Sequence, residues 1–185
     1  MRQIVVLTEE DSARIVVEHI ASSRGLSDRV KVIPHEGKSD LEASIPRKIG
    51  HWRASDPPRF IILRDNDGSN CSKLKSRLHN LVPNAAHDRV KIRIVMHELE
   101  SWYLGDLAAL AAAGLVSPEK AEALTKKAKL RNPERLTNAK QEFRRLVMTM
   151  GQIELANRIG PFLDADRCRS KSFRQFLEAL SWAAS

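Results

Sequence analysis

Short apolar runs alternate with segments of helical periodicity from the start of the chain to Gly114. Residues 3–8 (QIVVLT) form a mostly β-branched run without helical period, which is typical of a strand buried on both faces of a parallel sheet. Residues 11–25 then repeat apolar side chains at helical spacing, and Gly25 marks a helix end. The alternation recurs three times. Further strands are predicted over residues 30–34, 59–64 and 90–96, and further helices over 39–52, 72–81 and 98–114.

Four strand–helix units predict an α/β fold, with a predominantly parallel four-stranded sheet and helices on both faces. Pro46 falls inside the second of these helices, so we expect that helix to be broken or to begin later. After Gly114 the pattern is helical only, and Ser117-Pro118 and Asn132-Pro133 each read as an N-cap followed by proline at the first helical position. The sequence therefore predicts an α/β core over residues 1–115 and a helical C-terminal extension over 116–185, packed on the core in a single structural domain.

The composition agrees with one globular domain. The chain has 185 residues, of which 42% are apolar and 29% charged, enough for a core of its own. Its apolar runs fall short of the roughly 20 residues that a membrane-spanning helix needs, and the N-terminus lacks the features of a secretory signal. A cytoplasmic protein is the simplest prediction. Cys71 and Cys168 have no metal-ligand spacing and read as reduced thiols.

The net charge of +8 is unevenly distributed. Residues 120–145 carry nine Lys or Arg against three Glu, which favours an anionic partner. Solvated faces of two surface helices are the alternative, and charge alone does not separate nucleic acid from an acidic protein. The candidate nucleic-acid contacts are Lys126, Lys127, Lys129, Arg131, Arg144 and Arg145.

Acidic residues follow two of the predicted strands. Glu9 and Glu10 come just after the first strand, and Asp65 and Asp67 come just after the third. Functional residues of open parallel sheets gather at the carboxyl ends of the strands, and side chains two apart on an extended backbone point to one side. Carboxylates that converge repel each other unless a cation or a proton intervenes. The pattern predicts a site for a hard divalent ion, Mg²⁺ or Mn²⁺.

A strand-end turn is the alternative interpretation of this segment. Residues 65–68 (DNDG) are also good turn residues, because Asp and Asn bond their own backbone and glycine tolerates positive φ. A calcium loop of the EF-hand type does not match, since its required Gly and Glu positions hold Asn70 and Ser76.

Residues 65–69 (DNDGS) locally resemble the nucleophile motif of haloacid-dehalogenase-type phosphatases. That resemblance implies a phosphoryl-accepting Asp65 and an acid/base Asp67. In those phosphatases the motif stands at the start of the fold, whereas here it follows the third predicted strand, and a later acidic pair is absent from the sequence.

A wider resemblance begins with VVLTEED at residues 5–11 and ILRDNDG at 62–68, which together look like the Toprim domain of topoisomerases, bacterial primases and overcoming-lysogenization-defect-type nucleases. HELESWYLGD at 97–106 and RSKSFRQFLEAL at 169–180 are similar to the Toprim-like bacterial family known as domain of unknown function 4276. These segments span nearly the whole chain.

The resemblance implies roles for individual residues. Glu9 corresponds to the general acid/base, and Asp65 and Asp67 correspond to the metal-binding pair. Many Toprim sequences have Gly where this chain has Glu10, so either glutamate is a candidate for the catalytic role, with Glu9 nearer the strand end. Glu100 is a candidate accessory metal ligand.

Three other residues near this motif have structural alternatives. Trp102 and Asp106 complete the match to the family motif, and Trp102 with the neighbouring Tyr103 is expected in the core. His97 is either a structural residue or a general base.

The function that follows is a Mg²⁺- or Mn²⁺-dependent nuclease that grips the nucleic-acid backbone through its basic segment. The alternatives are a dehalogenase-type phosphatase and a non-catalytic adaptor that binds nucleic acid or an ATPase. The resemblance also implies a partner ATPase of the AAA or ABC kind and a bacterial defence context. The chain itself carries no G-x-x-x-x-G-K-[ST] phosphate loop.

Overall fold

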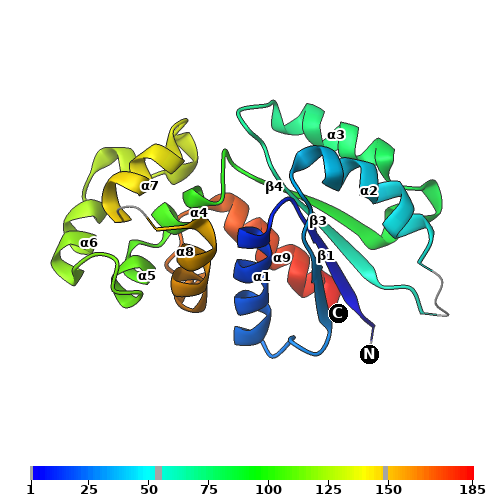
Figure 1. Cartoon of the computed structure of the whole chain (residues 1–185), viewed down its shortest axis with the longest axis horizontal. Helices are drawn as coiled ribbons and strands as arrows, with labels where there is room; N and C mark the ends of the chain where they lie inside the picture. Colours follow the sequence, from blue (N-terminus) through cyan, green and yellow to red (C-terminus); the bar gives the residue numbers. More distant parts are fainter. Residues whose placement is uncertain (1, 53–55, 148–149) are drawn as a thin grey trace.

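The computed structural model describes residues 2–52, 56–147 and 150–185. Its centre is a four-stranded, fully parallel sheet in the order β2-β1-β3-β4 (Figure 1). The strands are β1 (Ile4–Thr8), β2 (Val30–Ile33), β3 (Arg59–Asp65) and β4 (Val90–Val95). The predicted fold class is confirmed.

The two central strands end at the same edge of the sheet. Thr8, the last residue of β1, pairs with Leu63 of β3, so β3 continues two residues further to Asp65. All five residues of β1 are fully buried, as expected for a strand covered on both faces. The loops that follow β1 and β3 therefore start side by side.

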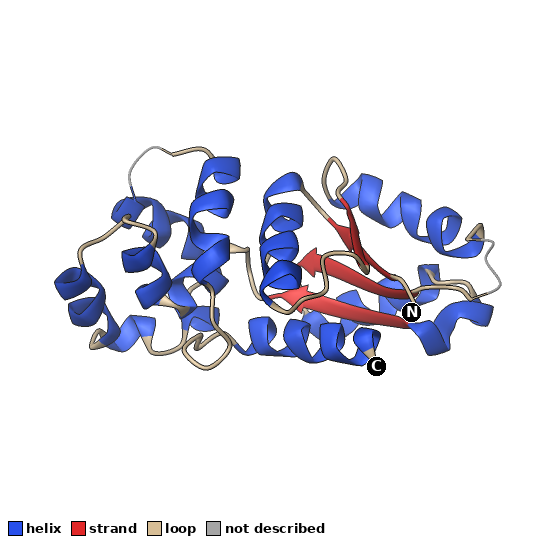
Figure 2. Ribbon diagram, turned by 90° about the horizontal axis from the view of Figure 1, so that it is seen from below, coloured by secondary structure: helices blue, strands red, loops and turns tan. Residues whose placement is uncertain are grey.

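Helices cover both faces of the sheet, and side-chain alternation along the strands divides the core in two. Ile4 and Val6 face one cluster, which includes α1 (Asp11–Ser23) and α9 (Lys171–Ala184). Val5 and Leu7 face the other, which includes α2 (Lys38–Gly50) and α3 (Cys71–Leu81). Figures 1 and 2 show α9 running along the sheet on the side opposite to α2 and α3.

The expectation that Pro46 breaks or delays the second helix is wrong. α2 is continuous from Lys38 to Gly50 with Pro46 inside it. Proline removes a backbone hydrogen bond to the residue four positions earlier, here Glu42. Pro46 lies on the exposed side of the helix, while Leu41 and Ile45 are fully buried against the sheet. Packing of the apolar side therefore keeps the helix intact.

The single helix predicted over residues 98–114 is two short helices, α4 (Glu100–Gly105) and α5 (Leu107–Ala112). Asp106 stands between them with non-helical backbone angles, and its side chain caps α5 by accepting a hydrogen bond from the Ala109 N–H. Gly105 packs so tightly that an added Cβ would lie 2.8 Å from the Cys168 sulfur. The break is a tertiary effect, which local periodicity does not reveal.

The remaining helical region lies beside the sheet (Figure 2). As predicted, Ser117 caps a helix that begins at Pro118, whereas Asn132-Pro133 opens only a 3₁₀ turn. Within the described residues, no helix has the length and apolar character needed to cross a membrane. The elements of this region are α6 (Pro118–Thr125), η2 (Ala128–Leu130), η3 (Pro133–Arg135), α7 (Ala139–Val147), α8 (Gln152–Ile159) and η4 (Gly160–Phe162), and η1 (Asn84–Arg89) precedes β4.

Glu134 ties this region to the end of the sheet. Its backbone carbonyl accepts a hydrogen bond from the His97 ring at 3.0 Å, and its carboxylate accepts one from the Ser170 hydroxyl at 2.8 Å. Glu98, after β4, in turn accepts a hydrogen bond from the backbone N–H of Lys140 in α7. The helical region is thus attached directly to the loop that follows β4.

Candidate functional site

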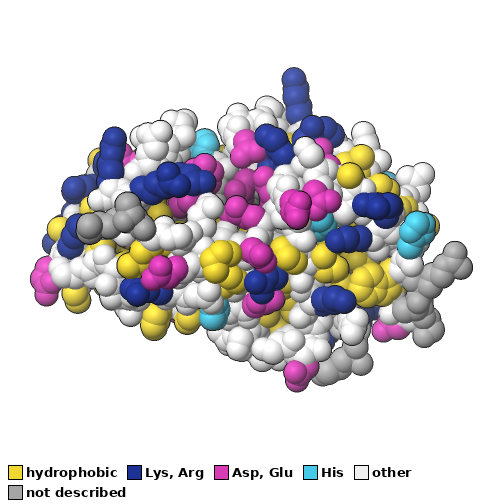
Figure 3. Space-filling model, viewed as in Figure 1, with side chains coloured by type: hydrophobic (Ala, Val, Ile, Leu, Met, Phe, Trp, Pro, Cys, Tyr) yellow, Lys and Arg dark blue, Asp and Glu magenta, His cyan; other side chains and the backbone are white. Residues whose placement is uncertain are grey.

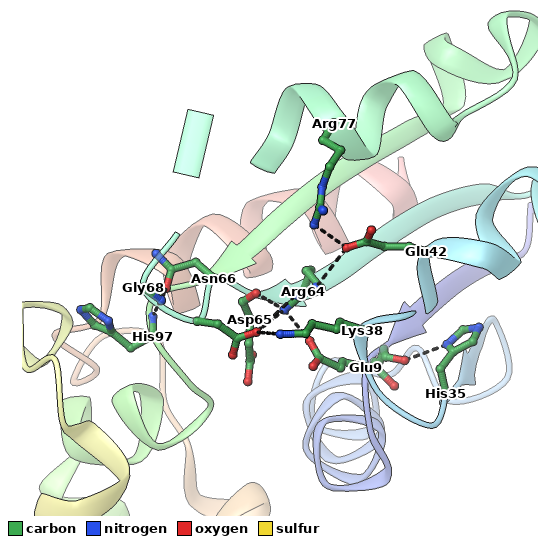
Figure 4. A network of polar contacts seen from close by, with 12 residues as sticks. Glu9, His35, Lys38, Glu42, Arg64, Asp65, Asn66, Gly68, Arg77 and His97 are labelled. Atoms are coloured by element: carbon green, nitrogen blue, oxygen red, sulfur yellow. Dashed lines mark hydrogen bonds and ion pairs between the residues drawn. The ribbon is translucent and has the colours of Figure 1, made fainter. Parts of the chain in front are cut away.

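Five carboxylates gather where the strands end, and we call them the carboxylate rim. Two follow β1, two lie in or just after the end of β3, and one opens α4 after β4. Figure 4 shows Glu9 and Asp65 of this group beside Arg64. They are Glu9, Glu10, Asp65, Asp67 and Glu100. The parallel order of the sheet thus brings together acidic residues as far apart in sequence as Glu9 and Glu100.

The electrostatics show that these groups are close enough to influence one another. Burial raises the pKa of Asp65 well above its usual range, and the charges of Glu9, Glu10, Glu100 and Asp67 raise it further. Burial also raises the pKa values of Glu9 and Glu100. Such shifts indicate negative charge that lacks full compensation.

The backbone turns immediately after Asp65. Asp67 has a φ of 47°, in the left-handed region that a non-glycine residue rarely adopts. The expectation that Asp65 and Asp67 point to one side assumed an extended backbone through residue 67, and that premise is wrong because β3 ends at Asp65. The Asp67 carboxylate instead lies 3.3 Å from the Arg64 guanidinium and 3.4 Å from the Lys38 ammonium.

Asn66 holds this turn in place, a role that the sequence analysis missed. Its side-chain oxygen accepts hydrogen bonds from the backbone N–H of His97 at 2.8 Å and of Gly68 at 3.1 Å. Its amide group donates to the Ser69 carbonyl at 3.1 Å. His97 also has positive φ, at 61°, so one buried amide fixes two unusual backbone conformations after neighbouring strands (Figure 4). The available sequence signal was an Asn between two acidic residues.

Arg64 is the second residue that the sequence analysis missed. Its side chain is 3% exposed and donates to the Glu9 carboxylate at 2.7 Å and to Asp67 at 3.3 Å. It also donates to the Asp65 backbone carbonyl. An arginine within the apolar run FIILR was the available signal, since buried arginines are rare without a partner.

The donor types of the rim fit a hard divalent cation. Its ligands would all be carboxylate oxygens, which Mg²⁺ and Mn²⁺ prefer, and Asp65 has no salt bridge within the described residues. In this arrangement, however, no three His, Cys, Asp or Glu groups of the described residues stand closely enough to hold an ion. Glu9 and Asp67 are turned toward Arg64 instead. An ion at the rim therefore requires side-chain rotation.

The family model for the domain of unknown function DUF4276 matches residues 7–181, from the end of β1 into α9. The chain belongs to this family. The predicted resemblance is thereby confirmed, and the match takes in the carboxylate rim as well as the helical region.

Solved structures with the same fold are similar to this DUF4276 chain over its whole length. The C-terminal region of the Burkholderia pseudomallei OLD protein aligns with a TM-score of 0.63 and 16% identity, covering 99% of each chain. The C-terminal region of the Xanthomonas campestris pv. campestris OLD protein aligns with a TM-score of 0.58 and 16% identity, covering 100% of this chain and 97% of the other. Identity at this level shows a shared fold. A search of curated proteins gives no match.

The DUF4276 motif after β4 divides into a rim residue and core residues. Glu100 is 6% exposed and belongs to the rim. Trp102 is fully buried and packs against Phe173, and Tyr103 is 3% exposed, which confirms the expectation of a core position. Asp106 is 1% exposed and is bound by Arg167 at 3.2 Å, so it is a structural carboxylate.

The predicted basic contacts fall into two groups. Lys126 pairs with Glu122, and Lys129 and Arg145 both pair with Glu142. The other three candidates form no salt bridge with a described residue, and they are Lys127, Arg131 and Arg144.

Figure 3 shows acidic side chains in the middle of this face of the molecule, with Lys and Arg on both sides of them.

Proposed function

We propose that this protein is a Toprim-type nuclease that hydrolyses phosphodiester bonds with Mg²⁺ or Mn²⁺ bound at the carboxylate rim. The observation that carries the proposal is the meeting of five carboxylates at the ends of the strands, with a strongly raised pKa at the partly buried Asp65. Uncompensated acidic clusters at the carboxyl edge of a parallel sheet are typical of sites that bind a cation.

The residues of the rim divide the work. Asp65, Asp67 and Glu100 are the proposed ligands, and a bound ion would neutralise the scissile phosphate and polarise a water molecule. Glu9 or Glu10 would move the proton. Glu9 faces Arg64, whereas Glu10 accepts a hydrogen bond from the Ser12 hydroxyl at the start of α1. We favour Glu9, because it directly follows the last residue of β1, Thr8.

Nucleic acid is the proposed substrate because basic side chains flank the acidic centre on both sides (Figure 3). Contacts to the phosphate backbone position a strand without reading its sequence. The matched structures are described as C-terminal regions of OLD proteins, so this fold occurs as part of larger proteins. An AAA- or ABC-type ATPase partner, a cytoplasmic location and a bacterial defence role remain part of the proposal by resemblance.

The decisive experiment incubates the purified protein with labelled single- and double-stranded DNA and RNA, in Mg²⁺, Mn²⁺ or EDTA. We expect cleavage only with metal. Asp65→Asn and Asp67→Asn should each reduce it by at least about 100-fold, or roughly 2.7 kcal/mol of transition-state stabilisation. Asp166→Asn is the matched control, since it removes an exposed carboxylate outside the rim.

Two outcomes would replace the proposal. Turnover of small phosphomonoesters with an aspartyl-phosphate on Asp65, without nucleic-acid cleavage, would identify a phosphatase. Metal-independent nucleic-acid binding without cleavage, insensitive to Asp65→Asn, would identify an adaptor.

A further inference from the structure

Arg64 occupies the position in the carboxylate rim where a cation is expected. One terminal nitrogen of its guanidinium lies 2.7 Å from Glu9 Oε2 and 3.3 Å from Asp67 Oδ2, and the other terminal nitrogen lies 3.3 Å from the same Asp67 oxygen. The arginine thus bridges an acidic residue after β1 and one after β3 (Figure 4). Among the described residues, Lys38 also forms a salt bridge with a rim carboxylate, but it reaches only Asp67 and is 59% exposed, so its charge is largely screened.

A second layer of charge lies behind Arg64. Glu42 of α2 has its Oε1 atom 3.8 Å from Arg64 Nε, beyond hydrogen-bond distance, and that buried Nε has no hydrogen-bond partner among the described residues. The same Glu42 oxygen is held by Arg77 of α3 at 2.6 Å. The guanidinium therefore has an acceptor on the side away from the rim toward which it can shift.

The two rim contacts of Arg64 differ in strength. The contact to Glu9 is short, and the Glu9 side chain is 19% exposed. The contact to Asp67 is longer, and the Asp67 side chain is 39% exposed in a turn. Charge-assisted hydrogen bonds weaken with distance and with exposure to solvent. Asp67 is consequently the carboxylate that Arg64 releases more easily.

We propose that Arg64 is a positioning residue that serves as the internal counter-ion of the carboxylate rim and exchanges Asp67 for Glu42 when a divalent ion binds. In the metal-free protein it holds Glu9 and Asp67 in place against their mutual repulsion. When an ion takes Asp67, Arg64 keeps Glu9 and moves its free Nε toward Glu42. The inference rests on the proposed metal site, but not on the reaction performed there.

A measurable consequence follows, because arginine and metal compete for one carboxylate. Removing Arg64 leaves the acidic groups without their counter-ion, which destabilises the metal-free protein. The same change removes the competitor of the ion. Mn²⁺ should therefore stabilise an Arg64 variant more than it stabilises the wild-type protein.

The test measures the thermal midpoint of the full chain in EDTA and in Mn²⁺. For Arg64→Met we expect a lower midpoint in EDTA and an upward shift by Mn²⁺ at least twice that of the wild-type protein. Arg167→Met is the matched control, because it removes an arginine from the buried carboxylate of Asp106, away from the rim. Its midpoint should fall as well, but its Mn²⁺ shift should equal that of the wild type. A residue that was merely structural would behave like this control.

Two further variants keep the test valid if Arg64→Met does not fold. Arg64→Lys keeps the charge but lacks both the second nitrogen that contacts Asp67 and the Nε atom that faces Glu42, and it should show an intermediate Mn²⁺ shift. Arg64→Met with Asp67→Asn removes the repulsion together with the arginine, so its midpoint in EDTA should recover toward that of Asp67→Asn alone. An Mn²⁺ shift in Arg64→Lys or Arg64→Met no larger than that of the wild type would overturn the inference.

The outcomes separate this inference from the proposed nuclease. An enlarged Mn²⁺ shift in the Arg64 variants, without cleavage of any nucleic acid by the wild type, would support the inference and refute the nuclease. Metal-dependent cleavage by the wild type, with equal Mn²⁺ shifts in all variants, would support the nuclease and refute the role of Arg64. If Mn²⁺ changed the thermal midpoint of none of the proteins, the proposed exchange of Asp67 for Glu42 by Arg64 would be overturned.

Discussion

Two carboxylates of this protein, the buried Asp106 and the partly buried Asp65, have opposite surroundings. Asp106 is 1% exposed and accepts hydrogen bonds from the backbone N–H groups of Ala109 and Asp164, at 3.1 and 3.0 Å, and from the guanidinium of Arg167. Asp65 has no salt bridge among the described residues, and the charges of other carboxylates raise its pKa.

The difference shows how a structural carboxylate can be told from a functional one. Buried charge is tolerated in proteins when hydrogen bonds and an opposite charge compensate it. Asp106 meets that condition with its own chain, and it links α5 to the segment before α9. Asp65 does not meet it, and a bound cation would. The DUF4276 match over residues 7–181 takes in both residues, so a family match alone does not distinguish them.

The largest expected effect tests this contrast through stability. Asp106→Asn should lower the free energy of unfolding by about 2–3 kcal/mol, because charged hydrogen bonds to a buried acceptor are lost. Asp65→Asn should leave the metal-free protein as stable as the wild type or more stable, because repulsion is relieved. Urea denaturation in EDTA measures both changes. Equal losses in the two variants would end the distinction.

A smaller effect on stability tests whether the turn after β3, which contains Asn66 and Asp67, is held by hydrogen bonds as the Asp106 site is. Asn66→Ala should lower the free energy of unfolding by about 2 kcal/mol, since two backbone donors and one acceptor lose their partner. Asn70→Ala is the control, because Asn70 makes the single capping bond at the start of α3, a loss of about 1 kcal/mol. A loss at Asn66 no greater than at Asn70 would contradict the view that Asn66 holds the turn after β3.

The pH dependence of the metal-free protein provides the next test. The pKa of Asp65 is raised in the folded protein, so between its unfolded and folded pKa values the folded state binds more protons than the unfolded state. Stability should therefore fall as pH rises through that window, with the full loss present above the folded pKa. In Asp65→Asn this contribution should disappear. Denaturation curves of the wild type and of Asp65→Asn from pH 4 upward measure this contribution. Parallel pH profiles of stability would be inconsistent with a raised pKa at Asp65.

The smallest effect extends the comparison to partnered and unpartnered basic residues. Lys126 and Arg145 are paired with Glu122 and Glu142, whereas their neighbours Lys127 and Arg144 form no salt bridge with the described residues. Lys127→Ala and Arg144→Ala should each weaken binding of a single-stranded oligonucleotide several-fold and reduce the salt slope by about 1. Lys126→Ala and Arg145→Ala should have less effect, since those charges are already compensated. Fluorescence anisotropy at several salt concentrations gives both quantities, and equal effects within each neighbouring pair would contradict the assignment.

The sequence predicted those features that depend on neighbouring residues. Strand runs, helical periodicity and the Ser117 cap are local patterns, and the parallel topology follows from their order. The acidic positions at the ends of β1 and β3 were predicted for the same reason, because parallel strands end at one edge.

Features set by distant partners were not predicted. Arg64 has its role only because α2 brings Glu42 behind it and β1 brings Glu9 beside it. The helix break at Asp106 depends on residues 164 and 167, some 60 positions further along the chain. Likewise, the pairing of Lys129 with Glu142 removes part of a basic patch that charge counting included.

The position of α9 links its unfolding to that of the sheet. α9 packs against β3 and β4, although more than 70 residues separate it from β4, and its last turn is held by the Arg29 side chain through the Ala184 carbonyl. Contacts of such high sequence separation slow folding and join distant segments into one cooperative unit. We expect amide hydrogens of β3 and α9 to exchange with solvent at a common rate. A fragment that lacks α9 should expose the apolar face of the sheet and aggregate.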